Sequence, residues 1–322
     1  MTRNTGPQAG SFPVKLPVKL PIKKLLLVLG LVATAYAAAL LIWGDSPKIS
    51  LVRLWSWAGL QAAVLCLLNY LLRGIRWRLW MAHYGRHFGW LEGLRLYLAG
   101  YAFTPTPGNV GEAVRGLMLA RNPLGARQSL AIFGAERLAD LLCLLLLCLP
   151  AAGWALAQSA MQPAPSWLVG LVVAVLLVAA IVLGGLAKYR RVLLQRFAWL
   201  QEAWHCLAVR PLVWFALTLS AWVVQGIAVW LICTHMSVSL GVATAVGFYA
   251  VAMVAGALSA LPAGLGGTEA VLTGLLVAQS ATPGQALTIT VLVRLLTLWL
   301  AVAIGVMALL YSAAIRKDIS FR

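Results

Sequence analysis

Four acidic residues lie within or at the ends of apolar segments: Glu112, Glu136, Asp140 and Glu269. A charge at the centre of a bilayer costs roughly 2.5–3.5 kcal/mol on insertion scales, so each acid needs a partner or a water-filled cavity. A carboxylate in that setting binds a cationic or hydroxylated group, exchanges a proton, or forms an internal ion pair. The sequence is consistent with all three kinds of chemistry.

Glu136 and Asp140 are spaced i,i+4 and share one face of a helix, with Arg137 one step round. Two interpretations are open for this group: an internal ion-pair cluster, or part of a substrate site. Arg115, Arg137 and Arg294 have the same two options. They pair with nearby acids, or they bind a lipid phosphate together with the free N–H groups of a helix N-terminus.

Two stretches rich in proline and glycine interrupt apolar runs and precede Glu112 and Glu269. Their residues are Pro105, Pro107, Gly108, Asn109 and Gly111 in the first stretch and Pro262, Gly264, Gly266 and Gly267 in the second. Such broken backbone cannot face lipid, because its unpaired N–H and C=O groups cost several kcal/mol each. Paired breaks of this kind point to the binding site of a transporter. Each acid is then a helix N-terminal carboxylate, a substrate-binding group, or both at different stages.

The two stretches belong to a longer repeat. Pro262 and Glu269 lie 157 positions after Pro105 and Glu112, and Arg294 lies 157 positions after Arg137. In both copies 25 residues separate the acid from the arginine. Pro, Glu and Arg are rare in this chain, so their coincidence at one offset predicts an internal duplication.

The composition indicates a polytopic helical membrane protein. Apolar residues make up 62% of 322 positions, the mean hydropathy is +0.90 and only 10% of residues are charged. The net charge of +17 comes from basic residues between apolar spans, which favours anionic lipid headgroups over nucleic acid as the partner. The five cysteines and four histidines show no metal-ligand spacing, so we expect no metal and no cofactor.

Charge counting along the chain predicts the topology. Residues 1–24 form a basic, proline-rich cytoplasmic arm, residues 25–315 a single membrane domain, and residues 316–322 a cytoplasmic tail. The predicted full spans are 25–43, 54–72, 129–150, 167–187, 212–233 and 285–311. Two re-entrant hairpins are predicted at 91–121 and 240–279, although residues 240–261 are long enough to span. Loop 151–166 lies outside, and residues 188–210 form an amphipathic surface helix.

Because the charges orient the two hairpins oppositely, the halves 54–150 and 212–311 form an inverted repeat, an architecture of alternating-access carriers. Between the second span and the first hairpin, Arg73, Arg76 and Trp77 predict an interfacial segment that touches lipid headgroups. Alternatively, the two arginines reach into a substrate path.

Several of these motifs resemble one family. They are Arg-Gly-Ile-Arg-Trp-Arg (73–78), Pro107 to Glu112 with Arg115, Glu136-Arg137-Leu138-Ala139-Asp140, and Leu261 to Glu269 with Arg294. Over about residues 50–310 the chain resembles the flippase-like transmembrane domain of lysylphosphatidylglycerol synthases. The resemblance implies a bacterial inner-membrane protein that moves lipids or lipid-linked headgroups between leaflets. The aminoacyl-transferase domain of such synthases is not expected here.

Three hypotheses about function follow. The first is a lipid flippase-like transporter without an enzymatic step, in which Glu112 and Glu269 bind a cationic or hydroxylated group and the arginines bind phosphate or acids. The second is a membrane-embedded transferase with Glu136 or Asp140 as base. The third is a scaffold for a separate synthase or glycosyltransferase.

Overall fold

The computed structural model of the chain describes residues 56–106, 109, 112–113, 115–116, 124–161, 197–259 and 261–320, with scattered positions at 34 and between 170 and 192. The predicted arm 1–24 and most of the predicted spans 25–43 and 167–187 lie outside the described residues. So do the break residues Pro107, Gly108 and Gly111.

The described residues form α-helices with short 3₁₀ and π segments, and no strand occurs among them. The first half contains α3 (Trp57–His83), α4 (Trp90–Gly100), η2 (Tyr101–Phe103), α5 (Ala126–Leu147) and α6 (Leu149–Met161). The second half contains α8 (Ala198–Ala208), α9 (Pro211–His235), α10 (Val242–Leu258), η4 (Pro262–Gly264), α11 (Gly267–Ala278), α12 (Pro283–Arg294), η5 (Leu295–Trp299) and α13 (Leu300–Ser320).

Four helices in the described part of the chain are long and apolar enough to cross a membrane. They are Trp57–His83, Ala126–Gln158, Pro211–His235 and Pro283–Ser312. The prediction of an all-helical, multi-pass membrane protein is therefore confirmed. The predicted total of six spans is not tested by these residues.

Two predicted boundaries are wrong. The helix expected to end at residue 72 continues to His83, because the buried Asp140 neutralises charge on Arg73 and Arg76, which follow the apolar run. The loop expected to begin at residue 151 is helical up to Met161, because α6 follows α5 after one turn residue and is rich in alanine, a strong helix former. The amphipathic helix expected within 188–210 is present as α8, which packs against α5.

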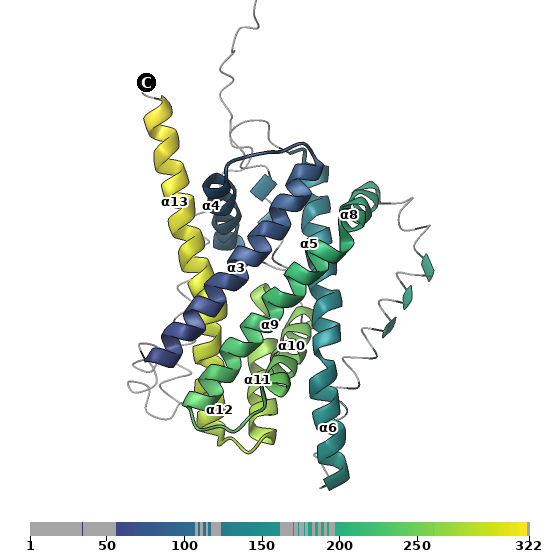
Figure 1. The fold of residues 1–322 in the computed structure, drawn as a ribbon, viewed down its shortest axis with the longest axis vertical. Helices are drawn as coiled ribbons and strands as arrows, with labels where there is room; N and C mark the ends of the chain where they lie inside the picture. Colours follow the sequence, from purple (N-terminus) through teal and green to yellow (C-terminus); the bar gives the residue numbers. More distant parts are fainter. Residues whose placement is uncertain are drawn as a thin grey trace, which may run out of the picture.

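The two predicted breaks interrupt short apolar helices. After α4 and η2 the chain turns at Thr104–Thr106, and Asn109 has a φ of 56°. After α10 come Ala263, Gly264 and Gly266 with φ values of 54°, 68° and 84°, a region that glycine adopts without steric cost. At 17 residues, α10 is shorter than the four spans. Figure 1 shows α4 beside the C-terminal part of α13, with α10 and α11 toward the opposite end of the bundle.

Small residues allow the broken helices to pack closely on the long ones. A Cβ at Gly305 of α13 would lie 2.4 Å from the backbone nitrogen of Ala102 in η2. A Cβ at Gly226 of α9 would lie 2.7 Å from the Cα of Val246 in α10. Helices in membranes associate through such close backbone approaches. Together with the packing of α3 along α9, these contacts hold the short helices against the long ones.

Candidate functional site

Two arginines of α3, Arg73 and Arg76, point into the protein. Arg76 is 0% exposed, and its Nη1 donates to Oδ1 of Asp140 at 2.7 Å and to Oγ1 of Thr218 at 2.9 Å. Arg73 donates to the other oxygen of Asp140. Trp77, one residue further on, is also buried. The interfacial assignment of Arg73, Arg76 and Trp77 is therefore wrong: because α3 continues through them and α5 supplies the carboxylate, they face the core and not the headgroups.

A second set of ion pairs ties the first broken helix to α5. Arg115 is 1% exposed and donates to Oε2 of Glu112 at 2.6 Å and to Oε2 of Glu136 at 3.1 Å. Its guanidinium lies over the ring of Tyr97, 4.4 Å from the centroid. Oε1 of Glu112 accepts a hydrogen bond from Thr104 at 2.8 Å. The interpretation of Glu136 and Asp140 as members of an internal ion-pair cluster is thus confirmed.

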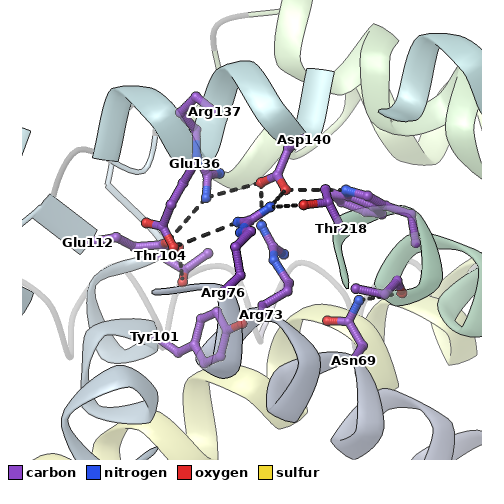
Figure 2. A network of polar contacts seen from close by, with 12 residues as sticks. Asn69, Arg73, Arg76, Tyr101, Thr104, Glu112, Glu136, Arg137, Asp140 and Thr218 are labelled. Atoms are coloured by element: carbon purple, nitrogen blue, oxygen red, sulfur yellow. Dashed lines mark hydrogen bonds and ion pairs between the residues drawn. The ribbon is translucent and has the colours of Figure 1, made fainter. Parts of the chain in front are cut away.

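Arg137 joins the two sets of ion pairs and is the most exposed member of the cluster. Its Nη2 lies 3.4 Å from Oε2 of Glu112 and 3.4 Å from Oδ2 of Asp140, and its side chain is 32% exposed. Figure 2 shows it bridging the two carboxylates. The cluster holds four arginines (73, 76, 115 and 137) against three acids (112, 136 and 140), which leaves one positive charge.

The second copy of the repeat contains the corresponding pair. Nε of Arg294 donates to Oε1 of Glu269 at 2.7 Å, and its Nη2 donates to the carbonyl oxygen of Ala263 at 2.9 Å. The partners are 25 residues apart, as Arg137 and Glu112 are. In each copy the arginine of the following helix therefore contacts the acid after the break, which was one of the two options predicted for it.

Between the two copies lies a cavity of about 80 Å³. Thr104, Asn109 and Glu112 line it from the first break, and Ala263 lines it from the second. Three arginines also line it, namely Arg73, Arg137 and Arg294. The remaining lining residues come mainly from α3, α9, α10, η5 and α13, among them Asn69, Tyr70, Tyr101, Trp222, Gln225, Tyr249 and Thr297.

The sequence predictions missed the polar residues of α3 and α9 that line this cavity. Asn69 and Gln225 are 0% and 4% exposed, and each lies within an apolar span. An uncharged amide in such a span is itself a signal of a functional position, because burying a polar group in hydrocarbon has a cost.

The chemistry available to the site is charge and hydrogen bonding. In the described ranges no three His, Cys, Asp or Glu side chains gather as a metal site would require. The five cysteines, at 66, 143, 148, 206 and 233, are buried and unpaired by disulfides. The site offers fixed guanidinium groups, amide oxygens and aromatic faces around a small polar space, which is the composition of a binding site.

Comparison with known families agrees with this architecture. Residues 25–305 match the family described as the lysylphosphatidylglycerol synthase TM region. Because the match covers most of the chain, the protein belongs to this family, and its role is related to membrane lipids. No curated protein matches the chain.

Proposed function

We propose that the protein moves a phospholipid, or a lipid-linked headgroup, between the leaflets of a bacterial inner membrane without an enzymatic step of its own. In this proposal both termini are cytoplasmic, and the broken helices form re-entrant hairpins among six full spans. The lipid headgroup passes through the cavity between the two breaks, while its acyl chains stay in the bilayer.

The cavity is the observation that carries the proposal. It lies where both broken helices end, and irregular backbone at membrane depth is tolerated where it is buried in protein or lines a polar space. Carriers built from repeats bind their substrates at the repeat interface, next to discontinuous helices. The lining by Asn109 and Glu112 on one side and Ala263 and Arg294 on the other agrees with this pattern.

The paired acid–arginine contacts support an inverted repeat. The Glu112–Arg137 and Glu269–Arg294 pairs have the same separation in sequence. The broken helices they follow lie toward opposite ends of the bundle in Figure 1. A carrier that alternates between two such halves exposes its central site to one leaflet and then to the other.

The test is leaflet-resolved lipid movement in proteoliposomes. Wild type is compared with Glu112→Gln and Glu269→Gln, which remove the acid of each pair. The matched control is Glu202→Gln, because Glu202 of α8 pairs with the exposed Arg127 of α5 and does not line the cavity. We expect movement of one phospholipid by wild type and by the control, and a loss of about tenfold or more in both pair variants, since each removes a charge-assisted hydrogen bond.

Other outcomes decide between the remaining hypotheses. No movement of any lipid by protein that is folded by gel filtration and circular dichroism would refute the transport proposal and favour a scaffold for a separate synthase or glycosyltransferase. Chemical change of the headgroups in the same vesicles would favour a transferase.

A further inference from the structure

We infer that the cavity selects a lipid phosphate whose headgroup is uncharged and carries hydroxyl groups, and that it discriminates against ammonium-bearing headgroups. The inference deepens the proposed function and rests on it, since the site is the one through which the lipid would pass. Three features of the cavity support the inference: a carboxylate whose oxygens already have partners, an excess of guanidinium groups over carboxylates, and buried amide oxygens that accept no hydrogen bond within the described residues.

The carboxylate in the cavity lining is already satisfied. Oε1 of Glu112 accepts from Thr104, and Oε2 contacts Arg115 at 2.6 Å and Arg137 at 3.4 Å. The Glu112 side chain is only 3% exposed. An ammonium group would have to displace a guanidinium from this acid, so Glu112 does not serve as its counter-ion.

The charge of the lining favours an anion. Among the described residues the lining contains Arg73, Arg137 and Arg294 and one acid, Glu112, while Glu269 offsets the charge of Arg294 from outside the lining. The cluster that supplies the first two has one more arginine than acids. The buried Nε–H groups of Arg73 and Arg137 also make no hydrogen bond within the described residues. A phosphate oxygen is the acceptor that such groups bind best, and a second cation at this position is repelled.

The wall formed by α3 and α9 offers acceptors without charge. Nδ2 of Asn69 donates to the carbonyl oxygen of Ala221 at 2.6 Å, which directs Oδ1 elsewhere. Within the part of the chain that the structure describes, neither this buried oxygen nor the buried Oε1 of Gln225 accepts a hydrogen bond. Figure 2 shows Asn69 on the other side of Arg73 from Glu112. Amide oxygens accept from hydroxyl groups, and the nearby Trp222 adds an aromatic face.

The size of the cavity fits a headgroup and not a whole lipid. A single water needs about 10–15 Å³ of such space, so a cavity of about 80 Å³ takes several small polar groups. A phosphate beside the arginines and a hydroxylated group beside the amides fill two different walls of one site. Glycerol and sugar headgroups linked through phosphate have this chemistry.

Binding in detergent tests the inference without any requirement for transport. The probes are dihexanoyl phosphatidylglycerol and dihexanoyl phosphatidylethanolamine, measured by isothermal titration at equal salt concentration. We expect the glycerol headgroup to bind about tenfold tighter or more, because the ammonium group meets repulsion and no free carboxylate. Equal binding, tighter binding of the ethanolamine lipid, or no binding of either probe would overturn the inference.

Two variants separate the walls of the site. Gln225→Met removes the amide oxygen at nearly constant volume, and it should abolish the preference for phosphatidylglycerol over dihexanoyl phosphatidic acid, which lacks the hydroxylated group. Gln201→Met on the exposed face of α8 is its control and should keep the preference. Arg137→Gln should lower the affinity for all phosphate-bearing probes by a similar factor. Arg137→Lys, which keeps the positive charge, should lower it less. A preference unchanged in Gln225→Met would contradict the role of the amide wall.

The source of the phosphate is decided in the same experiment. Free glycerol 3-phosphate, which has no acyl chains, should bind more weakly than the short-chain lipid. Binding as tight as that of the lipid would overturn the assignment to a lipid substrate. Selective binding without lipid movement in vesicles would refute the proposed function alone, whereas movement with no headgroup preference would refute this inference alone.

Discussion

The substitution Asp140→Asn tests how the buried cluster contributes to folding. Asp140 accepts from Arg73, from Arg76 at 2.7 Å and from Trp222 at 3.3 Å, and it lies 3.4 Å from Arg137. Asparagine has nearly the same shape, but it replaces one acceptor oxygen by a donor that faces guanidinium groups. The cluster then holds four arginines against two acids.

The expected loss of stability follows from burial. The side chains of Arg76 and Asp140 are 0% and 6% exposed, so water does not replace the lost charge. Removing one partner of a buried ion pair costs about 3–5 kcal/mol. For the surface pair of Arg127 and Glu202, whose side chains are 55% and 24% exposed, Glu202→Gln should cost less than about 1 kcal/mol.

Reversible unfolding in mixed micelles, titrated with sodium dodecyl sulfate and followed by far-ultraviolet circular dichroism, measures both variants under equal conditions. The double variant Arg76→Met/Asp140→Asn restores the original excess of one positive charge. Its loss in free energy of unfolding should be smaller, by about 0.5–3 kcal/mol, than the sum of the losses measured for Arg76→Met alone and Asp140→Asn alone. An Asp140→Asn protein as stable as Glu202→Gln, or strict additivity in the double variant, would refute the argument that the cluster acts as a coupled unit.

Three further predictions concern single positions and can be checked in the same micelles. The Tyr70 hydroxyl donates to the backbone carbonyl oxygen of Leu296, in the π segment η5, at 3.1 Å. Tyr70→Phe should therefore lower the free energy of unfolding by about 1 kcal/mol in the same titration. An unchanged free energy would show that this contact is not formed. Gly305→Ala should cost about 1–3 kcal/mol because its methyl group would meet the backbone of Ala102 at 2.4 Å, whereas Gly153→Ala, with nothing within 4 Å, should be neutral or stabilising. Burial raises the pKa of the Cys206 thiol to about 11, so the thiol stays protonated at pH 8. It should react with iodoacetamide only after the protein unfolds, which mass spectrometry detects. Labelling of Cys206 in the folded protein at pH 8 would contradict the burial of this residue.

Local composition accounts for the features that were predicted correctly. A helix that crosses hydrocarbon must be long and apolar, so the spans at α3, α5, α9 and α12–α13 were recognisable from the chain alone. Proline and several glycines close together disfavour a continuous helix, so both breaks were also recognisable, and α4 and α11 are short as expected. The equal separation of 25 residues between each acid and its arginine was also visible in the sequence, and pairing of the two was one of the two options that it left open; the structure contains both contacts.

Helix ends were less predictable, because a helix continues past charged residues when their charges are paired. The run after residue 72 is basic and rich in tryptophan, a pattern typical of a membrane interface. The same pattern also suits a buried helix that carries arginines to acids on another element. Sequence alone does not distinguish these cases, and α3 belongs to the second.

What the sequence determined by itself is the membrane class, the family and the two broken helices, because each depends on residues close together in the chain. What only the tertiary structure decided is which charges meet. Asp140 pairs with Arg76 across 64 positions, and Asn69 contacts the backbone of Ala221 across 152. The cost of a charge in a membrane depends on its partner, and here that partner comes from another helix. The packing of α3, α5 and α9 therefore turned a basic stretch that resembles an interface into the wall of a central cavity.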